Sequence, residues 1–133
     1  MSNKSELVKI FESAAREAGK LIKEEFGKVT ESKVQSKDLG DFVTNTDLET
    51  ENILLNILKK NFPNSSYLTE ESDPFKGNDE TIVIDPIDGT SNFIHGIPSI
   101  GIVIARVHKE EITDGIIFNP VSDELFFATK DKG

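Results

Sequence analysis

The chain of 133 residues is long enough for one domain with a buried core. Its 24 Asp and Glu residues outnumber its 15 Lys and Arg residues, and the formal net charge of −9 argues against direct binding of nucleic acid, because a phosphate backbone would be repelled. The absence of cysteine excludes disulfides, thiolate zinc sites and thiol nucleophiles, and with no long apolar run we expect a cytoplasmic protein without a membrane partner.

The first predicted element is a long amphipathic helix. Its apolar residues repeat at the i, i+3, i+4, i+7 spacing of one helical face: Leu7, Ile10, Phe11, Ala14, Ala18, Leu21, Ile22 and Phe26. Asn3 and Glu6 have the spacing of a capping box, and Gly27 is expected to stop the helix. Residues 28–45 show no period, which predicts a loop that encloses a weak strand or hairpin.

A second helix is predicted to begin at Thr46. Thr46 and Glu49 form a Thr-x-x-Glu capping box, and apolar residues at helical spacing continue until the chain approaches Pro63. In this interpretation Asp47 lies in the first turn of the helix.

Five strands are predicted from short runs of β-branched and aromatic residues. They cover residues 66–69, 81–84, 100–107, 112–118 and 124–129. Turns at residues 109–110 and 119–120 make the last three an antiparallel meander. We therefore expect an α+β fold with two long helices packed on a largely antiparallel sheet.

Three carboxylates are expected to meet where two neighbouring strands end. A turn at Pro86 and Ile87 would aim Asp85 and Asp88 at one point, and the preceding strand would deliver Glu70. Carboxylates so close to each other repel unless a cation lies between them. Oxygen ligands without Cys or His favour Mg²⁺, Mn²⁺ or Ca²⁺ over zinc or copper. The alternative is a plain solvated turn, because Asp-Gly and Pro are common turn formers.

The residues that follow predict an anion site. Gly89, Thr90, Ser91 and Asn92 look like the start of a short helix, whose free N–H groups attract a phosphate. The Thr90 hydroxyl can hold a water against a charged acceptor, and Asp47 is the candidate acceptor. Beside a metal site, this pattern indicates metal-assisted phosphoryl hydrolysis.

Three segments resemble, in order and spacing, the motifs of the inositol monophosphatase family. They are residues 42–47 (FVTNTD), 68–72 (LTEES) and 85–93 (DPIDGTSNF). The resemblance covers essentially the whole chain and implies a magnesium-dependent phosphatase, a hydrolase of inositol monophosphate or a related small phosphorylated polyol. It also implies the αβαβα fold of that family, of which residues 1–133 would be a single N-terminal metal-binding domain. The family's C-terminal Trp-Asp-x-Ala-Ala-Gly segment does not occur in these residues.

The same resemblance implies metal ligands. Those for Mg²⁺ would be Glu70, Asp85, Asp88 and the carbonyl of Ile87. Lys37 and Asp41 match a loop that, in the family, helps to hold a further metal ion near the active site.

It also implies catalytic and substrate-binding residues. The catalytic set would be Asp47, Glu70 and Thr90, in which Thr90 and Asp47 activate the attacking water. The substrate phosphate would lie against Asp88, Gly89, Thr90 and Ser91.

A second hypothesis is a truncated, non-catalytic domain that binds metal, phosphate or a protein partner without turnover. It is motivated by the missing C-terminal segment, whose aspartate ligates a metal in the family. Half of a fold also leaves a sheet edge and apolar surface exposed, so we expect a homodimer or other self-association.

Overall fold

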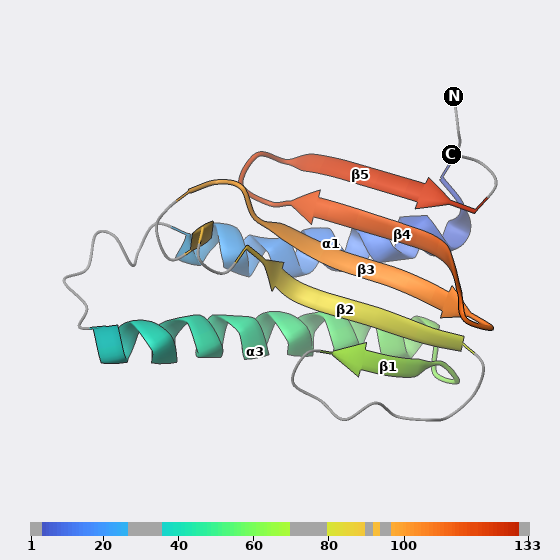
Figure 1. Cartoon of the computed structure of the whole chain (residues 1–133), viewed down its shortest axis with the longest axis horizontal. Helices are drawn as coiled ribbons and strands as arrows, with labels where there is room; N and C mark the ends of the chain where they lie inside the picture. Colours follow the sequence, from blue (N-terminus) through green and yellow to red (C-terminus); the bar gives the residue numbers. More distant parts are fainter. Residues whose placement is uncertain (1–3, 27–35, 70–79, 90–91, 94–96, 131–133) are drawn as a thin grey trace.

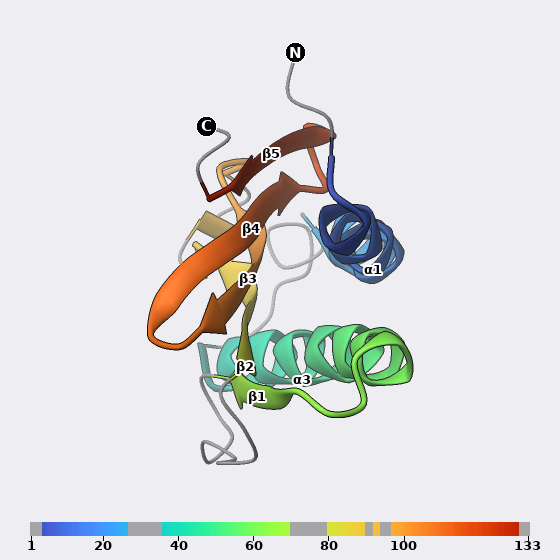
Figure 2. The same cartoon turned by 90° about the vertical axis from the view of Figure 1, so that its right-hand side faces the viewer.

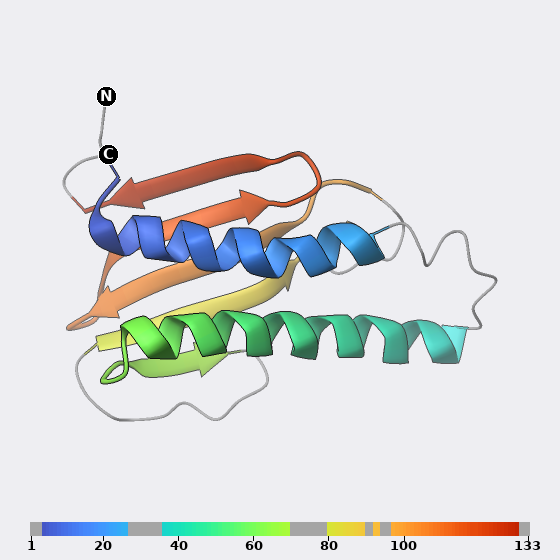
Figure 3. The same ribbon diagram turned by 180° about the vertical axis from the view of Figure 1, so that it is seen from behind.

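The computed structural model describes residues 4–26, 36–69, 80–89, 92–93 and 97–130. Its elements are α1 (Glu6–Glu25), α3 (Ser36–Asn61), β1 (Ser66–Thr69), β2 (Glu80–Asp88), β3 (Gly101–His108), β4 (Glu111–Asn119) and β5 (Glu124–Thr129) (Figure 1). Both helices lie on one face of the sheet, as the views from the edge and from behind show (Figures 2 and 3). The predicted α+β fold is confirmed.

The five strands follow one another in the order β1-β2-β3-β4-β5. β1 and β2 are parallel, and the other neighbouring pairs are antiparallel. The turn between β3 and β4 consists of Lys109 and Glu110 with φ of 48° and 68°, the left-handed geometry that suits a two-residue hairpin. The predicted ranges of the strands at 66–69 and 124–129 are confirmed, and β3 and β4 are within a residue of prediction at each end.

The core lies between the helices and the facing side of the sheet. α1 buries Val8, Phe11, Ala14, Ala15, Ala18 and Ile22, and α3 buries Leu54 and Leu58. The sheet buries Ile82, Ile84, Ile102, Ile104, Ile116 and Phe118. These residues alternate with less buried ones along each strand, as expected of a sheet covered on one face. Neither described helix has the length and apolar character that crossing a membrane requires.

The N-cap of α1 differs from the predicted one. Ser5, not Asn3, is the N-cap: its hydroxyl accepts a hydrogen bond from the Val8 N–H at 3.1 Å. The same hydroxyl lies 3.3 Å from Asp114 Oδ2, to which it donates. Because this second bond reaches β4, the cap is chosen by a tertiary contact that the local pattern does not contain. Asn3 and Gly27, the predicted start and stop, lie outside the described residues.

α3 begins ten residues earlier than predicted, at Ser36 rather than Thr46, so the prediction of a loop is wrong for residues 36–45. Thr46 is buried inside the helix, and its carbonyl accepts a hydrogen bond from the Thr50 hydroxyl at 2.7 Å. The capping box at Thr46 is a short-range pattern, and it predicted the wrong helix start. No proline lies between Ser36 and Thr46, so nothing in the sequence prevents a helix there. The helix ends at Asn61, before Pro63 as predicted.

Asp114 and Arg106 form a polar cluster between β3 and β4, close to the turn that joins these two strands. Arg106 donates to Asp114 Oδ1 at 3.1 Å and to Glu80 Oε1 at 3.0 Å, linking β2, β3 and β4. Asp114 is only 3% exposed and also accepts from Ser5 and Thr129. These hydrogen bonds connect β2, β3, β4, β5 and the N-cap of α1, which indicates a structural role.

Gly19 sets how closely α1 approaches the sheet. A Cβ at this position would stand 2.9 Å from Pro120 Cβ and 3.0 Å from Phe118 Cε2, both parts of stiff rings. Arg16 lies alongside, with its guanidinium carbon 4.8 Å from the centre of the Phe118 ring. The helix can therefore pack here only because residue 19 has no side chain.

Gly19→Ala is expected to lower the free energy of unfolding by about 1–2 kcal/mol, because overpacking outweighs the gain of about 1 kcal/mol that Ala gives in a helix. Urea unfolding at low protein concentration measures the change. Gly115→Ala is the matched control, since a Cβ there has no neighbour closer than 3.8 Å. A Gly19→Ala variant as stable as the wild type would refute the close-packing argument.

Tyr67 provides a pH-dependent test of core packing near β1. The side chain is buried, and its hydroxyl donates to the Phe62 carbonyl at 2.7 Å. Burial, with a smaller contribution from the charge of Glu80, raises the pKa of Tyr67 to about 12 from the ordinary value of 10.0. Between these values the unfolded chain loses a proton that the folded chain keeps, so stability falls as pH rises.

We expect the free energy of unfolding to decrease from pH 10 toward pH 12 and Tyr67→Phe to weaken that decrease. The chain has one tyrosine and no tryptophan, so ultraviolet absorbance of the folded protein follows the Tyr67 phenol alone. A phenol that ionises in the folded protein at its ordinary pKa would contradict the burial described.

Candidate active site

The two candidate carboxylates that the structure describes, Asp85 and Asp88, flank an irregularity in β2. Asp85 pairs with Val103 and Asp88 pairs with Gly101, so three steps along β2 match two along β3. One extra residue on one strand is a β-bulge. Pro86 lies inside the bulge, where its missing N–H costs no ladder hydrogen bond. The prediction that the strand ends at Asp85 before a Pro86–Ile87 turn is therefore wrong, because β2 continues to Asp88.

The bulge brings Asp85 and Asp88 to the same face of the sheet. On a regular strand, residues three apart point to opposite faces. Their partners Val103 and Gly101 are two apart on β3 and share a face, so the two aspartates share it as well. Asp85 is half-buried and Asp88 is exposed, whereas Ile87 between them belongs to the core and is 3% exposed.

β1 reaches the same end of the sheet. It runs parallel to β2, and its last residue, Thr69, pairs with Ile84, next to Asp85. Glu70, the predicted third carboxylate, follows Thr69 in the sequence but lies outside the described residues, as do Thr90 and Ser91.

A tight turn leaves β2 at Gly89. This residue has φ of +92°, and a Cβ on it would stand 2.9 Å from the Ser99 carbonyl oxygen. Both the positive φ and the close approach require glycine. The Asn92 amide donates to the same carbonyl at 2.7 Å, and the N–H of the buried Phe93 donates to the Gly89 carbonyl at 2.9 Å. These contacts hold Gly89 against Ser99 and Phe93.

A hollow of about 300 Å³ lies beside Asp88. Its lining includes three polar residues that the sequence analysis did not select, Ser99, Asn119 and Glu124. Asn119 and Glu124 are paired across the start of the β4–β5 hairpin, and antiparallel pairing carries that end of the hairpin to the carboxyl end of β2. The order and pairing of the strands place these residues beside Asp88, and their residue types alone do not indicate that position.

Asp47 lies well inside α3 and is half-buried, so the prediction that it lies in the first turn of the helix is wrong. α3 packs on β2, and the N-terminal part of α3 lies at the same end of the molecule as the carboxyl end of β2 (Figures 1 and 3). Lys37 and Asp41, predicted in a loop, are in the helical backbone of α3, and their side chains lie outside the description.

The described residues do not make a complete metal site by themselves. Among them, with Glu70 excluded, no three Asp, Glu, His or Cys side chains form a group that could hold a metal ion. Asp85 and Asp88 nevertheless provide two carboxylates on one face, and oxygen donors of this kind fit a hard divalent cation. These two donors therefore fit magnesium in type.

The chain resembles known proteins in both sequence and structure. The sequence profile of the inositol monophosphatase family matches residues 3–133. The inositol-1-monophosphatase of Caulobacter vibrioides is 41% identical over 123 residues, which cover 90% of this chain and 48% of that protein. Inositol monophosphatase 3 of Solanum lycopersicum is 38% identical, and the match covers 90% of this chain and 46% of that protein.

Among solved structures, the extragenic suppressor protein SuhB of Bartonella henselae superposes with a TM-score of 0.80 at 35% identity. That match covers 97% of this chain and 50% of the SuhB chain. The chain spans about half the length of the curated relatives it matches and corresponds to their amino-terminal half. With nearly every residue matched by the family profile and the fold shared with SuhB, the protein belongs to the inositol monophosphatase family.

Proposed function

We propose that this chain carries the magnesium-binding part of a phosphatase that hydrolyses inositol monophosphate, or a related small sugar phosphate, to the alcohol and inorganic phosphate. The observation that carries the proposal is the bulge in β2, which puts Asp85 and Asp88 on one face directly before the tight turn at Gly89. Membership of the inositol monophosphatase family supports the reaction class. The cysteine-free composition fits a cytoplasmic location.

In this proposal Asp85, Asp88 and the Ile87 carbonyl would hold Mg²⁺ together with Glu70. When bound there, the ion would supply a lowered pKa for a water molecule and positive charge beside the leaving oxygen. The side chain of Ile87 is buried in the core, which fixes the backbone between Asp85 and Asp88. The backbone therefore helps to set the distance between the two carboxylates.

The turn after β2 would receive the phosphate. Gly89 leaves the backbone uncovered by a side chain, and the proposal assigns the N–H groups of Gly89, Thr90 and Ser91 to the phosphate oxygens. Asp88 lies at the edge of the hollow where a polyol could lie. The Thr90 hydroxyl and the Asp47 carboxylate would orient the water and take up its proton, with Asp47 held by the frame of α3 instead of by a helix terminus.

A second candidate function follows from the length of the match. Because the chain spans about half of its relatives, it can instead be a domain that binds metal, phosphate or a protein partner without turnover.

Phosphate release from inositol 1-phosphate with millimolar Mg²⁺ tests the first proposal. Asp85→Asn is expected to lower the rate by about a hundredfold or more, because it removes a charged metal ligand. Asp123→Asn is the matched control, because Asp123 lies on the β4–β5 turn and is not part of the proposed site. Its Oδ1 forms an ion pair with Arg16 Nη1 at 2.7 Å. Equal rates for the wild type and Asp85→Asn would end the catalytic proposal for this chain.

Titration calorimetry with Mg²⁺ separates the two candidates. Heat that Asp85→Asn abolishes, without phosphate release by the wild type, supports the binding domain. If the wild type shows neither heat of Mg²⁺ binding nor release of phosphate, both candidate functions are overturned.

A further inference from the structure

Asn119, the last residue of β4, makes hydrogen bonds with both ends of its side-chain amide. The amide nitrogen donates to the Pro98 carbonyl at 2.7 Å. The amide oxygen accepts from the N–H groups of Val121 and Ser122 at 3.0 and 3.2 Å, as in the turns that Asn commonly forms with the backbone that follows it. One end of the amide therefore shapes the β4–β5 turn, and the other end reaches a different part of the chain.

The segment that Asn119 reaches leads into β3. Residues 97–99 are exposed and lie outside every strand that the structure describes, so strand pairing does not hold them. Two side-chain amides bind neighbouring carbonyls of this segment instead. Asn119 donates to the carbonyl of Pro98 and Asn92 to that of Ser99, each at 2.7 Å.

The same segment packs against the Gly89 turn. A Cβ on Gly89 would stand 2.9 Å from the Ser99 carbonyl oxygen and 3.5 Å from Ile100 Cα, which shows how closely the two backbones approach. The Phe93 N–H donates to the Gly89 carbonyl at 2.9 Å and ties the turn from its other side. A shift of the backbone at residues 98–99 would therefore displace Gly89.

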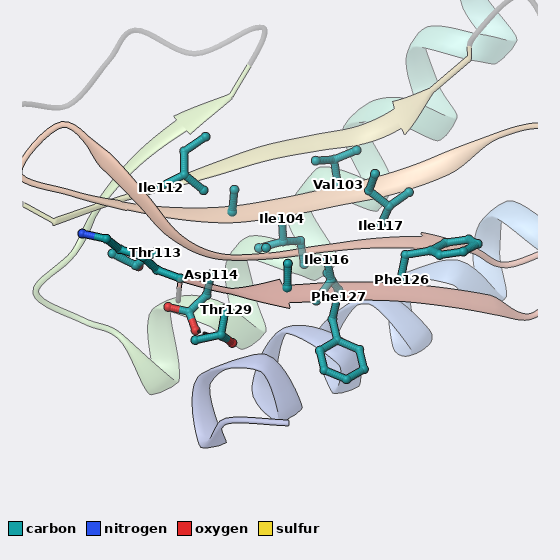
Figure 4. Close-up of a pocket in the computed structure, with 14 residues that line it drawn as sticks. Val103, Ile104, Ile112, Thr113, Asp114, Ile116, Ile117, Phe126, Phe127 and Thr129 are labelled. Atoms are coloured by element: carbon teal, nitrogen blue, oxygen red, sulfur yellow. Dashed lines mark hydrogen bonds between the residues drawn. The ribbon is translucent and has the colours of Figure 1, made fainter. Parts of the chain in front are cut away.

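The position of Asn119 in the sheet explains how it reaches this segment. In the register of the ladder Asn119 stands opposite Gly101, whose partner on the other side is Asp88. Asn119 shares the outer face of the sheet with Ile117, which lies two residues before it and next to Phe126 (Figure 4). Because the residue between the two strands is a glycine, the Asn119 amide can extend across β3 toward the end of β2.

We propose that Asn119 is a positioning residue for the phosphate-binding turn. Its amide fixes the Pro98 carbonyl, and the backbone of that segment fixes Gly89. The inference rests on the proposed function, which assigns the phosphate to the Gly89 turn, and Asn119 itself touches neither metal nor phosphate. Backbone donors bind an anion only within a narrow range of distance and angle, so a displaced turn binds phosphate more weakly.

Metal binding should depend much less on Asn119. Asp85 and Asp88 belong to β2, and they are held by its ladder with β3 and by burial of Ile87 in the core. Loss of the Pro98 bond leaves those contacts in place. A positioning role therefore predicts weaker phosphate binding with Mg²⁺ binding retained, whereas a general loss of structure would weaken both.

Two variants separate the two ends of the amide. Asn119→Asp keeps an oxygen acceptor for the β4–β5 turn but has no N–H group for the Pro98 carbonyl. Because a new carboxylate also repels phosphate, the neutral Asn119→Ser must give the same result. Its hydroxyl can still accept from the turn, but the side chain is too short to replace the bond to Pro98.

Titration calorimetry of the 133-residue chain with inorganic phosphate, in saturating Mg²⁺, measures the effect. Both variants should lower phosphate affinity about fivefold or more, the size of effect expected from the loss of one hydrogen bond. Their affinity for Mg²⁺ alone should stay within about twofold of the wild-type value, because the sites of the two ligands are held by different contacts.

Hydrogen exchange measures the positioning without any ligand. The Phe93 N–H, bonded to the Gly89 carbonyl, should exchange about tenfold faster in Asn119→Ser than in the wild type, because the turn opens more often. Asn61→Ser is the matched control: its amide also donates to a backbone carbonyl, that of Ile57 at 2.9 Å, but at the end of α3. It should leave Phe93 exchange and both affinities unchanged.

The outcomes separate this inference from the proposed function. A wild type that binds no phosphate in the presence of Mg²⁺ overturns the proposed function together with the inference. If the wild type binds phosphate and Asn119→Ser matches it in affinity and in Phe93 exchange, the inference alone is overturned, even if Asn119→Asp differs. Equal losses of Mg²⁺ and phosphate affinity, with faster exchange throughout the β2–β3 ladder, would also overturn it, because Asn119 would then only stabilise the fold.

Discussion

One-sided burial of the sheet is the constraint on which the rest of the structure depends. Both helices pack on the same face, where the isoleucines of β2, β3 and β4 are buried. Because side chains alternate along a strand, this choice of inner face also determines what the outer face carries. The close approach of α1 at Gly19 and the cap at Ser5, bonded to Asp114, tie that helix to the inner face at two separate points.

The bulge at Pro86 links this packing to the candidate chemistry. Without an extra residue, Asp85 and Asp88 would point to opposite faces, and one of them would enter the core. With it, Ile87 stays in the core while both carboxylates emerge on the outer face at the end of β2. Proline weakens an ordinary central strand because it cannot donate a ladder hydrogen bond. Pro86 lies where the ladder between β2 and β3 is already interrupted.

The candidate site and the apolar outer face are neighbours. Ile117 and Phe126 line both the hollow beside Asp88 and a larger hollow of about 460 Å³ on the outer face of β3, β4 and β5. The apolar outer face therefore forms one wall of the hollow beside Asp88.

The sequence by itself determined the family, the strand-rich second half and the bounds of β1 and β5, because strand periodicity and short motifs are local properties. It predicted a carboxylate cluster but not the bulge that puts Asp85 and Asp88 on one face. Only the tertiary structure decided the cap at Ser5, the early start of α3 and the proximity of Glu124 to Asp88. The reason is that caps, helix extensions and strand register are set by competing contacts with distant residues, and a local pattern contains only one side of each contact.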